Sequence, residues 1–100
     1  MFHLINERKP TVKIDVTNIK SSTELHLLLK DMLGFPNFYG ENWDAFWDAI
    51  TGLVELPMQI QFVGWGFLER NLPFDAKIMK ECLSDYNEEI YLAKCDFLFN

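Results

Sequence analysis

Two aspartates one helical turn apart, Asp44 and Asp48, are the side chains of this sequence best suited to recognise or transform a charged group. Residues four apart lie on one face of a helix, so both carboxylates point the same way and Trp47 lies beside them. The arrangement is locally unfavourable by roughly 0.2 to 0.5 kcal/mol, since like charges at this spacing repel each other. The pair therefore indicates a role other than folding.

Catalysis is the weaker interpretation of these two carboxylates. Glycosidases place their two acids on opposite sides of a substrate, whereas Asp44 and Asp48 share one side of a helix. His3 and His26 have no partner at metal-ligand spacing, and the acidic segment has no calcium-loop pattern. The sequence shows neither a phosphate-binding glycine loop nor a setting for a serine or cysteine nucleophile. We therefore expect no enzyme activity, no metal and no cofactor.

Binding of a cationic protein is the stronger interpretation. Rigid aromatic rings alternate with acids between residues 39 and 48, which is the composition of an interaction hot spot. Arg and Lys side chains that hold RNA phosphates would pair equally well with these carboxylates. Trp43 fits the core and the surface equally well by its position, whereas Trp47 lies on the polar side of the helix and is expected to be exposed.

The distribution of charge favours the same class of partner. The net charge is −6, and residues 31–69 contain six acidic residues and no Lys or Arg. Such a block repels nucleic acid and anionic membranes and attracts basic proteins. Charge alone would also fit an acidic domain whose charge serves only solubility. The interleaved aromatic residues are what distinguish the two interpretations.

Length and composition bound the fold class. One hundred residues with 49% hydrophobic content predict a single domain over residues 1–100 with a core of its own. Residues 1–5 are too short for the apolar part of a signal peptide, and no apolar run reaches the length of a membrane span, so we expect a cytoplasmic protein. Cys82 and Cys95 have neither metal-ligand nor redox spacing and are expected to be free, buried thiols.

Periodicity predicts an α/β fold. Alternating apolar residues indicate strands at 12–16, 57–63 and 90–99, and helical spacing indicates helices at 21–33, 43–53, 65–72 and 75–87. Strands separated by helices predict a three-stranded parallel sheet in a two-layered or three-layered domain with about four helices. Residues 1–10 form an extension that could add an edge strand, and deletion of residues 1–9 is expected to leave the domain folded.

The helix at 43–53 has clear start signals. Asn42 is the expected N-cap, and Asp44 falls in the first turn, where a carboxylate suits the helix dipole. The helix before it is expected to begin with a capping box formed by Ser21 and Glu24 and to stop at Gly34. The residues of the 43–53 helix expected to face the core are Ala45, Phe46, Ala49, Ile50 and Leu53.

The run from Phe38 to Ala49, Phe-Tyr-Gly-Glu-Asn-Trp-Asp-Ala-Phe-Trp-Asp-Ala, resembles the signature of the barstar family, small intracellular inhibitors of secreted ribonucleases. The resemblance spans nearly the whole chain after the first nine residues and includes Leu25-His26 and Thr51-Gly52. It implies a barstar-like fold in which an acidic helix and its preceding loop plug a nuclease active site.

The resemblance also implies which residues contact the partner. Asp44 and Asp48 correspond to the two central aspartates, the later of which enters the phosphate site of the nuclease, and a glutamate contact of the family falls on Asp85. The partner-binding residues so implied are Phe38, Tyr39, Gly40, Glu41, Asn42, Trp43, Asp44, Trp47, Asp48 and Asp85.

Three departures from the family pattern bear on the identity of the partner. Phe38 stands where the family has a tyrosine, Leu53 stands where a tryptophan is common, and the N-terminal extension is absent from the shortest relatives. The sequence therefore predicts an inhibitor, monomeric before binding, of a basic ribonuclease or ribonuclease toxin domain, and does not restrict the target to barnase-type enzymes. The alternative is a binding module with the same fold that does not inhibit.

Overall fold

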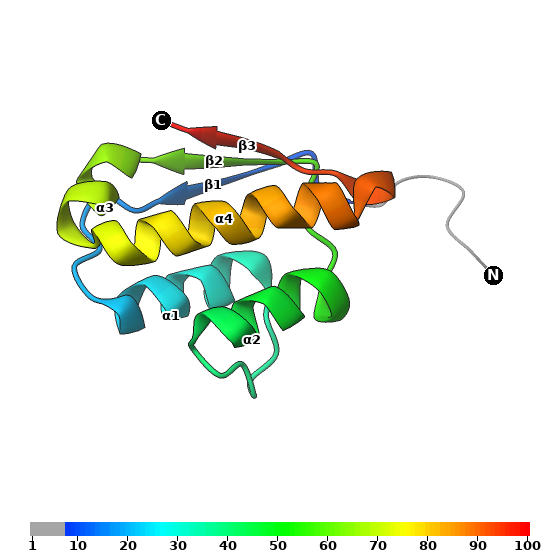
Figure 1. Cartoon of the computed structure of the whole chain (residues 1–100), viewed down its shortest axis with the longest axis horizontal. Coiled ribbons are helices and arrows are strands. Elements are labelled where there is room, and N and C mark those ends of the chain that lie inside the picture. Colours follow the sequence, from blue (N-terminus) through cyan, green and yellow to red (C-terminus); the bar gives the residue numbers. More distant parts are fainter. Residues whose placement is uncertain (1–7) are drawn as a thin grey trace.

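The structure, a computed structural model, describes residues 8–100 of the chain. Strands β1 (Thr11–Asp15), β2 (Gln59–Val63) and β3 (Asp96–Phe99) form a parallel sheet in the order β1-β2-β3. The helices α1 (Ser22–Leu33), α2 (Trp43–Asp48), α3 (Trp65–Asn71) and α4 (Pro73–Glu89) connect the strands (Figure 1). These elements confirm the predicted α/β fold with a three-stranded parallel sheet and four helices.

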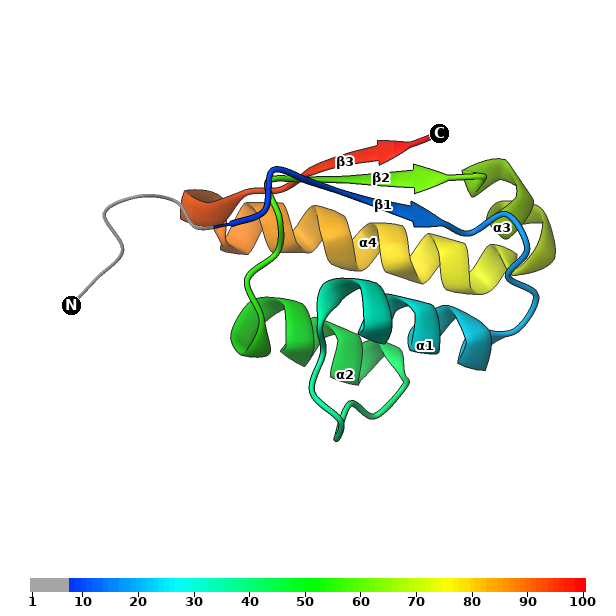
Figure 2. The ribbon, with the colours of Figure 1, turned by 180° about the vertical axis from the view of Figure 1, so that it is seen from behind.

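One face of the sheet carries the core. Figures 1 and 2 both show α1, α2 and α4 on the same side of the sheet, with α3 at its end. Buried and exposed side chains alternate along β1 as this arrangement requires. Ile14 is buried between the sheet and the helices, whereas Lys13 and Asp15 are exposed on the opposite face. The domain therefore has two layers. Its core side chains include Ile14, Leu25, Leu29, Phe46, Ile50, Ile60, Phe62, Leu68, Met79 and Leu83.

The ends of α1 form as the sequence predicts, with one difference. The Ser21 hydroxyl accepts a hydrogen bond from the Glu24 backbone N–H at 3.1 Å, and Gly34 ends the helix in the left-handed conformation at φ 72°. The Glu24 carboxylate accepts from the Lys20 backbone N–H at 3.1 Å, one residue before the position of a standard capping box. Both ends of α1 are thus fixed by local hydrogen bonds.

The helix predicted for residues 43–53 changes its geometry halfway. After α2 the chain continues as a π-helical turn at Ala49–Leu53, in which the Val54 N–H donates to the Ala49 carbonyl at 3.1 Å. A π turn has a longer repeat than an α-helix, so the last residues rotate away from the face that α-helical spacing assigns to them. The prediction that Leu53 faces the core is therefore wrong, and its side chain is 49% exposed.

The last strand is shorter than predicted. The interval expected to start a strand at residue 90 contains a 3₁₀ turn, Tyr91–Ala93, and β3 begins only at Asp96. The side chain of Asn87 in α4 hydrogen-bonds the backbone of this interval. Its amide oxygen accepts from the Cys95 N–H at 2.9 Å, and its amide nitrogen donates to the Cys95 carbonyl at 2.7 Å. The backbone before Asp96 is thereby held outside the sheet.

Arg8 and Lys9, which belong to the extension predicted at residues 1–10, are hydrogen-bonded to the rest of the fold. The Arg8 guanidinium donates to the carbonyls of Leu56, Pro57 and Lys94 at 2.7 to 2.8 Å, and the Lys9 carbonyl accepts from the Met58 N–H at 2.8 Å. Arg8 therefore links the segments that lead into β2 and β3. Residues 8–10 form no strand, and the rest of the predicted added strand lies outside the described residues.

Candidate partner-binding face

The loop before α2 is held by its own hydrogen bonds. The Tyr39 N–H donates to the Pro36 carbonyl at 3.0 Å, which closes a turn, and Glu41 has a positive φ of 55°. Asn42 is the N-cap, as predicted, because its side-chain oxygen accepts from the Ala45 N–H at 2.7 Å. Its amide also donates to the Gly40 carbonyl at 3.2 Å. Asn42 thus orders the loop and the start of α2 together.

A buried polar contact with α1 supports this loop. His26 of α1 is 1% exposed, and its Nδ1 lies 2.6 Å from the Tyr39 hydroxyl, whereas Nε2 has no hydrogen-bond partner within the described residues. Burial lowers the pKa of His26, against the opposing fields of Asp75 and Glu41, and burial also raises the pKa of the Tyr39 hydroxyl. Both groups are therefore neutral near pH 7. Tyr39, a predicted contact, has its ring in the core.

Trp43 links His26, which supports the loop, to helix α4. Its indole N–H donates to the Asp75 carboxylate at 2.8 Å, and its ring centroid lies 4.3 Å from that of His26. The same Asp75 oxygen accepts from the Ser22 hydroxyl at 3.2 Å. Of the two placements left open by the sequence, Trp43 takes an intermediate one, partly buried against the core. The start of α2 is thereby tied to both α1 and α4.

Trp47 is less exposed than its position on the polar side predicts. Its side chain is half-buried and packs against the core. The Thr51 hydroxyl donates to the Trp47 carbonyl at 2.6 Å, inside the segment where the α-helix gives way to the π turn. Trp47 can thus contribute only part of its ring to a partner.

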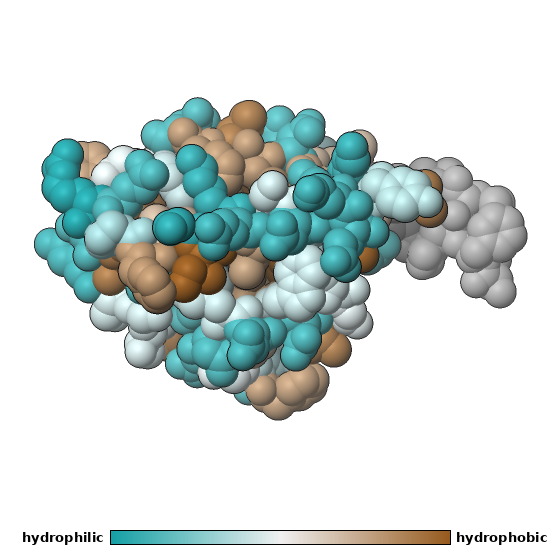
Figure 3. Space-filling model, in the orientation of Figure 1, coloured by the Kyte–Doolittle hydropathy of each residue, from teal (hydrophilic) through white to brown (hydrophobic). Residues whose placement is uncertain are grey.

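The carboxylates predicted to contact a partner are exposed. Glu41, Asp44, Asp48 and Asp85 all lie at the surface, and within residues 8–100 none of the three aspartates makes a hydrogen bond or salt bridge. Figure 3 shows hydrophilic atoms over the start of α2. Carboxylates without partners keep their full capacity to accept hydrogen bonds from Arg or Lys.

Asp48 borders a cavity with mostly apolar walls. The cavity, of about 260 Å³, is lined by Phe38, Tyr39, Gly40, Ala45, Asp48 and Leu53. Phe38 is 75% exposed, so it forms a rim rather than part of the core. An apolar wall beside a carboxylate suits a cationic side chain with an apolar stem or ring, because both parts find a matching surface. Ala45 and Leu53 were not predicted as site residues, since helical spacing assigned both to the core.

Helix α4 packs against α2, and Asp85 lies exposed on α4. The half-buried thiol of Cys82 has a raised pKa, chiefly from burial, with further contributions from the charges of Asp85, Glu81 and Asp44. Carboxylates from both α2 and α4 therefore act on the same thiol. Glu81 was not among the predicted contacts, although its spacing of four from Asp85 places it on the same face of α4.

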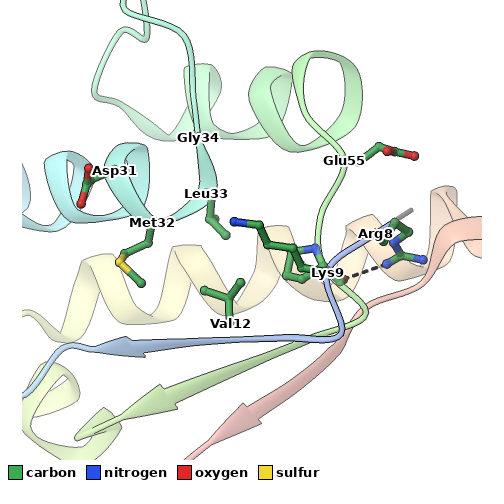
Figure 4. A pocket seen from close by; sticks show the side chains of 9 residues that line it. Arg8, Lys9, Val12, Asp31, Met32, Leu33, Gly34 and Glu55 are labelled. Atoms are coloured by element: carbon green, nitrogen blue, oxygen red, sulfur yellow. Dashed lines mark hydrogen bonds between the residues drawn. The ribbon is translucent and has the colours of Figure 1, made fainter. Parts of the chain in front are cut away.

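A second cavity, of about 290 Å³, lies at the other end of α1 and has no acidic excess. Its lining includes the charged residues Arg8, Lys9, Asp31 and Glu55, Lys9 extends toward Leu33, and Val12 and Met32 supply apolar walls (Figure 4). Within residues 8–100, no three His, Cys, Asp or Glu side chains are grouped so that they could hold a metal ion. The helices of this described range are all too short or too polar to cross a membrane.

Comparison with known proteins identifies relatives of the whole domain. The family model described as Barstar (barnase inhibitor) matches residues 9–100. A protein of Bacillus subtilis (strain 168) named "Putative ribonuclease inhibitor YrdF" is 36% identical over 77 residues, which cover 77% of this chain and 85% of that relative. Both matches include the loop and α2, on which the candidate face is built.

Proposed function

The chain belongs to the barstar family, and from that premise we propose that it is a stoichiometric inhibitor, or immunity protein, that blocks the active site of a basic ribonuclease or ribonuclease toxin domain. Asp44 and Asp48 enter the nuclease site in the place of RNA phosphates. Phe38, Gly40, Glu41, Trp47 and Asp85 surround them as further contacts, and Tyr39, Asn42 and Trp43 contribute through the loop that they hold in shape.

The inhibition follows from how a ribonuclease binds its substrate. Arg, Lys and protonated His side chains in such a site are arranged to hold phosphate oxygens, and a carboxylate offers similar acceptors with a similar charge. A rigid surface loses less entropy on binding than a mobile one, so the support of the loop by His26 and Trp43 favours tight binding. The inhibitor needs no chemistry of its own, because it only has to occupy the site.

The observation that carries the proposal is the position of Asp48. Its carboxylate is exposed and has no partner within residues 8–100, and it borders an apolar cavity formed by Phe38 and Leu53. A free charge beside apolar walls serves no evident purpose in the isolated domain. Burial of such a charge against a cation in a complementary site is the arrangement found at interaction hot spots.

The proposal extends to the setting of the protein. We place it in the cytoplasm, as a single domain that is monomeric before binding, where it would protect the cell from a nuclease. Cys82 and Cys95 are both free, which suits a reducing compartment. The fit of one chain to one nuclease site predicts a complex of one inhibitor and one enzyme.

Titration of barnase, the ribonuclease named in the description of the family, tests the proposal. RNA cleavage should fall linearly with added protein and end at one equivalent. The association rate should fall markedly from low to high salt while the dissociation rate changes less, because long-range attraction is screened beyond about 8 to 10 Å at physiological ionic strength. Binding without loss of RNA cleavage would support the non-inhibitory module instead.

A further inference from the structure

The outer face of α4 carries one continuous stripe that changes from apolar to acidic. Phe74, Ile78, Glu81 and Asp85 follow one another at intervals of four, three and four residues, so their side chains project from the same side of the helix. Phe74 is 73% exposed and Ile78 is half-buried, and neither belongs to the buried core. The acidic end of the stripe, Asp85, is one of the proposed partner contacts.

The apolar end of the stripe adjoins the same face of the molecule. Asp75, next to Phe74, accepts the hydrogen bond from the Trp43 indole at 2.8 Å, so the first turn of α4 lies against the first turn of α2. Figure 3 shows hydrophobic atoms gathered over the first turns of α4, on the side of α1. The first turn of α4 therefore packs near Trp43, and the stripe leads along the same side of α4 from Phe74 and Ile78 to Glu81 and Asp85.

On the basis of the proposed function, we propose that Phe74 and Ile78 form a second, apolar contact for the same ribonuclease. The surface fits a partner whose cationic active site is bordered by apolar side chains. Lys77, which is exposed on the same turns of α4, disfavours a cationic partner surface at this point, and the exposed ring of Phe74 favours an apolar one. The acidic residues would then govern association, and the apolar pair would slow dissociation.

Stopped-flow binding to barnase tests this contact with a double variant, Phe74→Ser with Ile78→Ser. We expect the dissociation rate to rise at least tenfold, while the association rate and its salt dependence stay within twofold of the wild type. Leu92→Ser is the matched control, since Leu92 is 89% exposed in the turn after α4, away from the stripe. Its dissociation rate should equal that of the wild type.

Further variants separate this inference from the proposed function. The conservative pair Phe74→Leu with Ile78→Val should restore slow dissociation, and the single variant Phe74→Ser replaces the double variant if thermal unfolding shows that the latter is unstable. If the serine variant dissociates from barnase at the wild-type rate while Asp48→Ala loses binding, the apolar contact alone is overturned. Unchanged binding in Asp48→Ala, or no binding by the wild type of barnase or of any other basic ribonuclease tested, would overturn the proposed function and this contact with it.

Discussion

Charged side chains serve two different purposes in two regions of this molecule. Arg8 donates to three backbone carbonyls of segments 48 to 86 residues away along the chain, so its charge is used within the fold. Asp44 and Asp48 stand at the surface with no hydrogen bond or salt bridge in the described part of the chain. The difference teaches that a charge committed to the fold has internal partners, whereas a charge available for binding has none.

The support beneath the two regions differs in the same way. Around Arg8, the backbone itself supplies the acceptors, and loss of the side chain would leave carbonyls without a donor. Beneath Asp44 and Asp48, neutral aromatic groups fix the backbone and leave the carboxylates untouched. Stability and binding should therefore respond to different substitutions, and each prediction below tests one part of that separation.

The largest loss of stability is expected from Arg8→Leu. Three charge-assisted hydrogen bonds would be lost, which should lower the free energy of unfolding by about 2 to 4 kcal/mol while affinity for barnase stays within threefold. Urea unfolding measures the change, with Lys13→Leu as the control on the exposed face of β1. Equal effects of the two substitutions would show that the hydrogen bonds of Arg8 do not hold β2 and β3 together.

Acid should weaken the fold through His26. Its pKa is lowered by burial in the folded state, so below the unfolded value of about 6.5 the unfolded chain takes up a proton that the folded chain does not. Unfolding free energy should therefore fall by up to about 1.4 kcal/mol per pH unit below pH 6.5 and be insensitive to His26 above it. The difference in unfolding free energy between the wild type and His26→Gln, measured at each pH, gives the contribution of His26 alone, because His3 is present in both proteins. A difference that stays constant from pH 7.5 to 5 would contradict a buried neutral imidazole.

Two adjacent loop residues should give opposite results. Tyr39→Phe leaves the His26 Nδ1 without its partner and should cost about 1 to 2 kcal/mol of stability. Phe38→Ala removes an exposed ring and should change stability by less than about 0.5 kcal/mol but weaken binding of barnase. Thermal unfolding and the inhibition constant are needed for both variants. Loss of stability in Phe38→Ala alone would reverse the roles assigned to these two rings.

Much of the fold and of the site could be predicted from local sequence signals. Gly34 and Asn42 act within a few residues of themselves, so the end of α1 and the start of α2 follow from residue type alone. The exposure of Asp44 and Asp48 follows from helical spacing. The parallel sheet follows from strands separated by helices, because a crossover connection is needed between parallel strands.

The errors arise where distant contacts decide the local structure. The late start of β3 depends on Asn87 and Arg8, which hold the backbone before Asp96. Leu53 was misplaced because no local signal shows the change from α-helical to π-helical spacing. The burial of Tyr39, a loop residue, depends on its contact with His26, which lies 13 positions earlier in α1. By contrast, Glu81 could have been found from its spacing to Asp85.

The most direct test of the separation between fold and binding is Asp48→Ala, measured for unfolding and for inhibition of barnase in the same preparation. The isolated variant should be as stable as the wild type or slightly more stable, since a like-charge neighbour is removed and helix propensity improves. Inhibition should weaken by at least about 2 kcal/mol, or roughly thirtyfold, because the cations of the nuclease would be buried without a partner. Members of this family are among the proteins on which that hot-spot rule rests, so what we infer is its transfer to Asp48. An Asp48→Ala protein that unfolds more easily, or that inhibits as well as the wild type, would contradict the account.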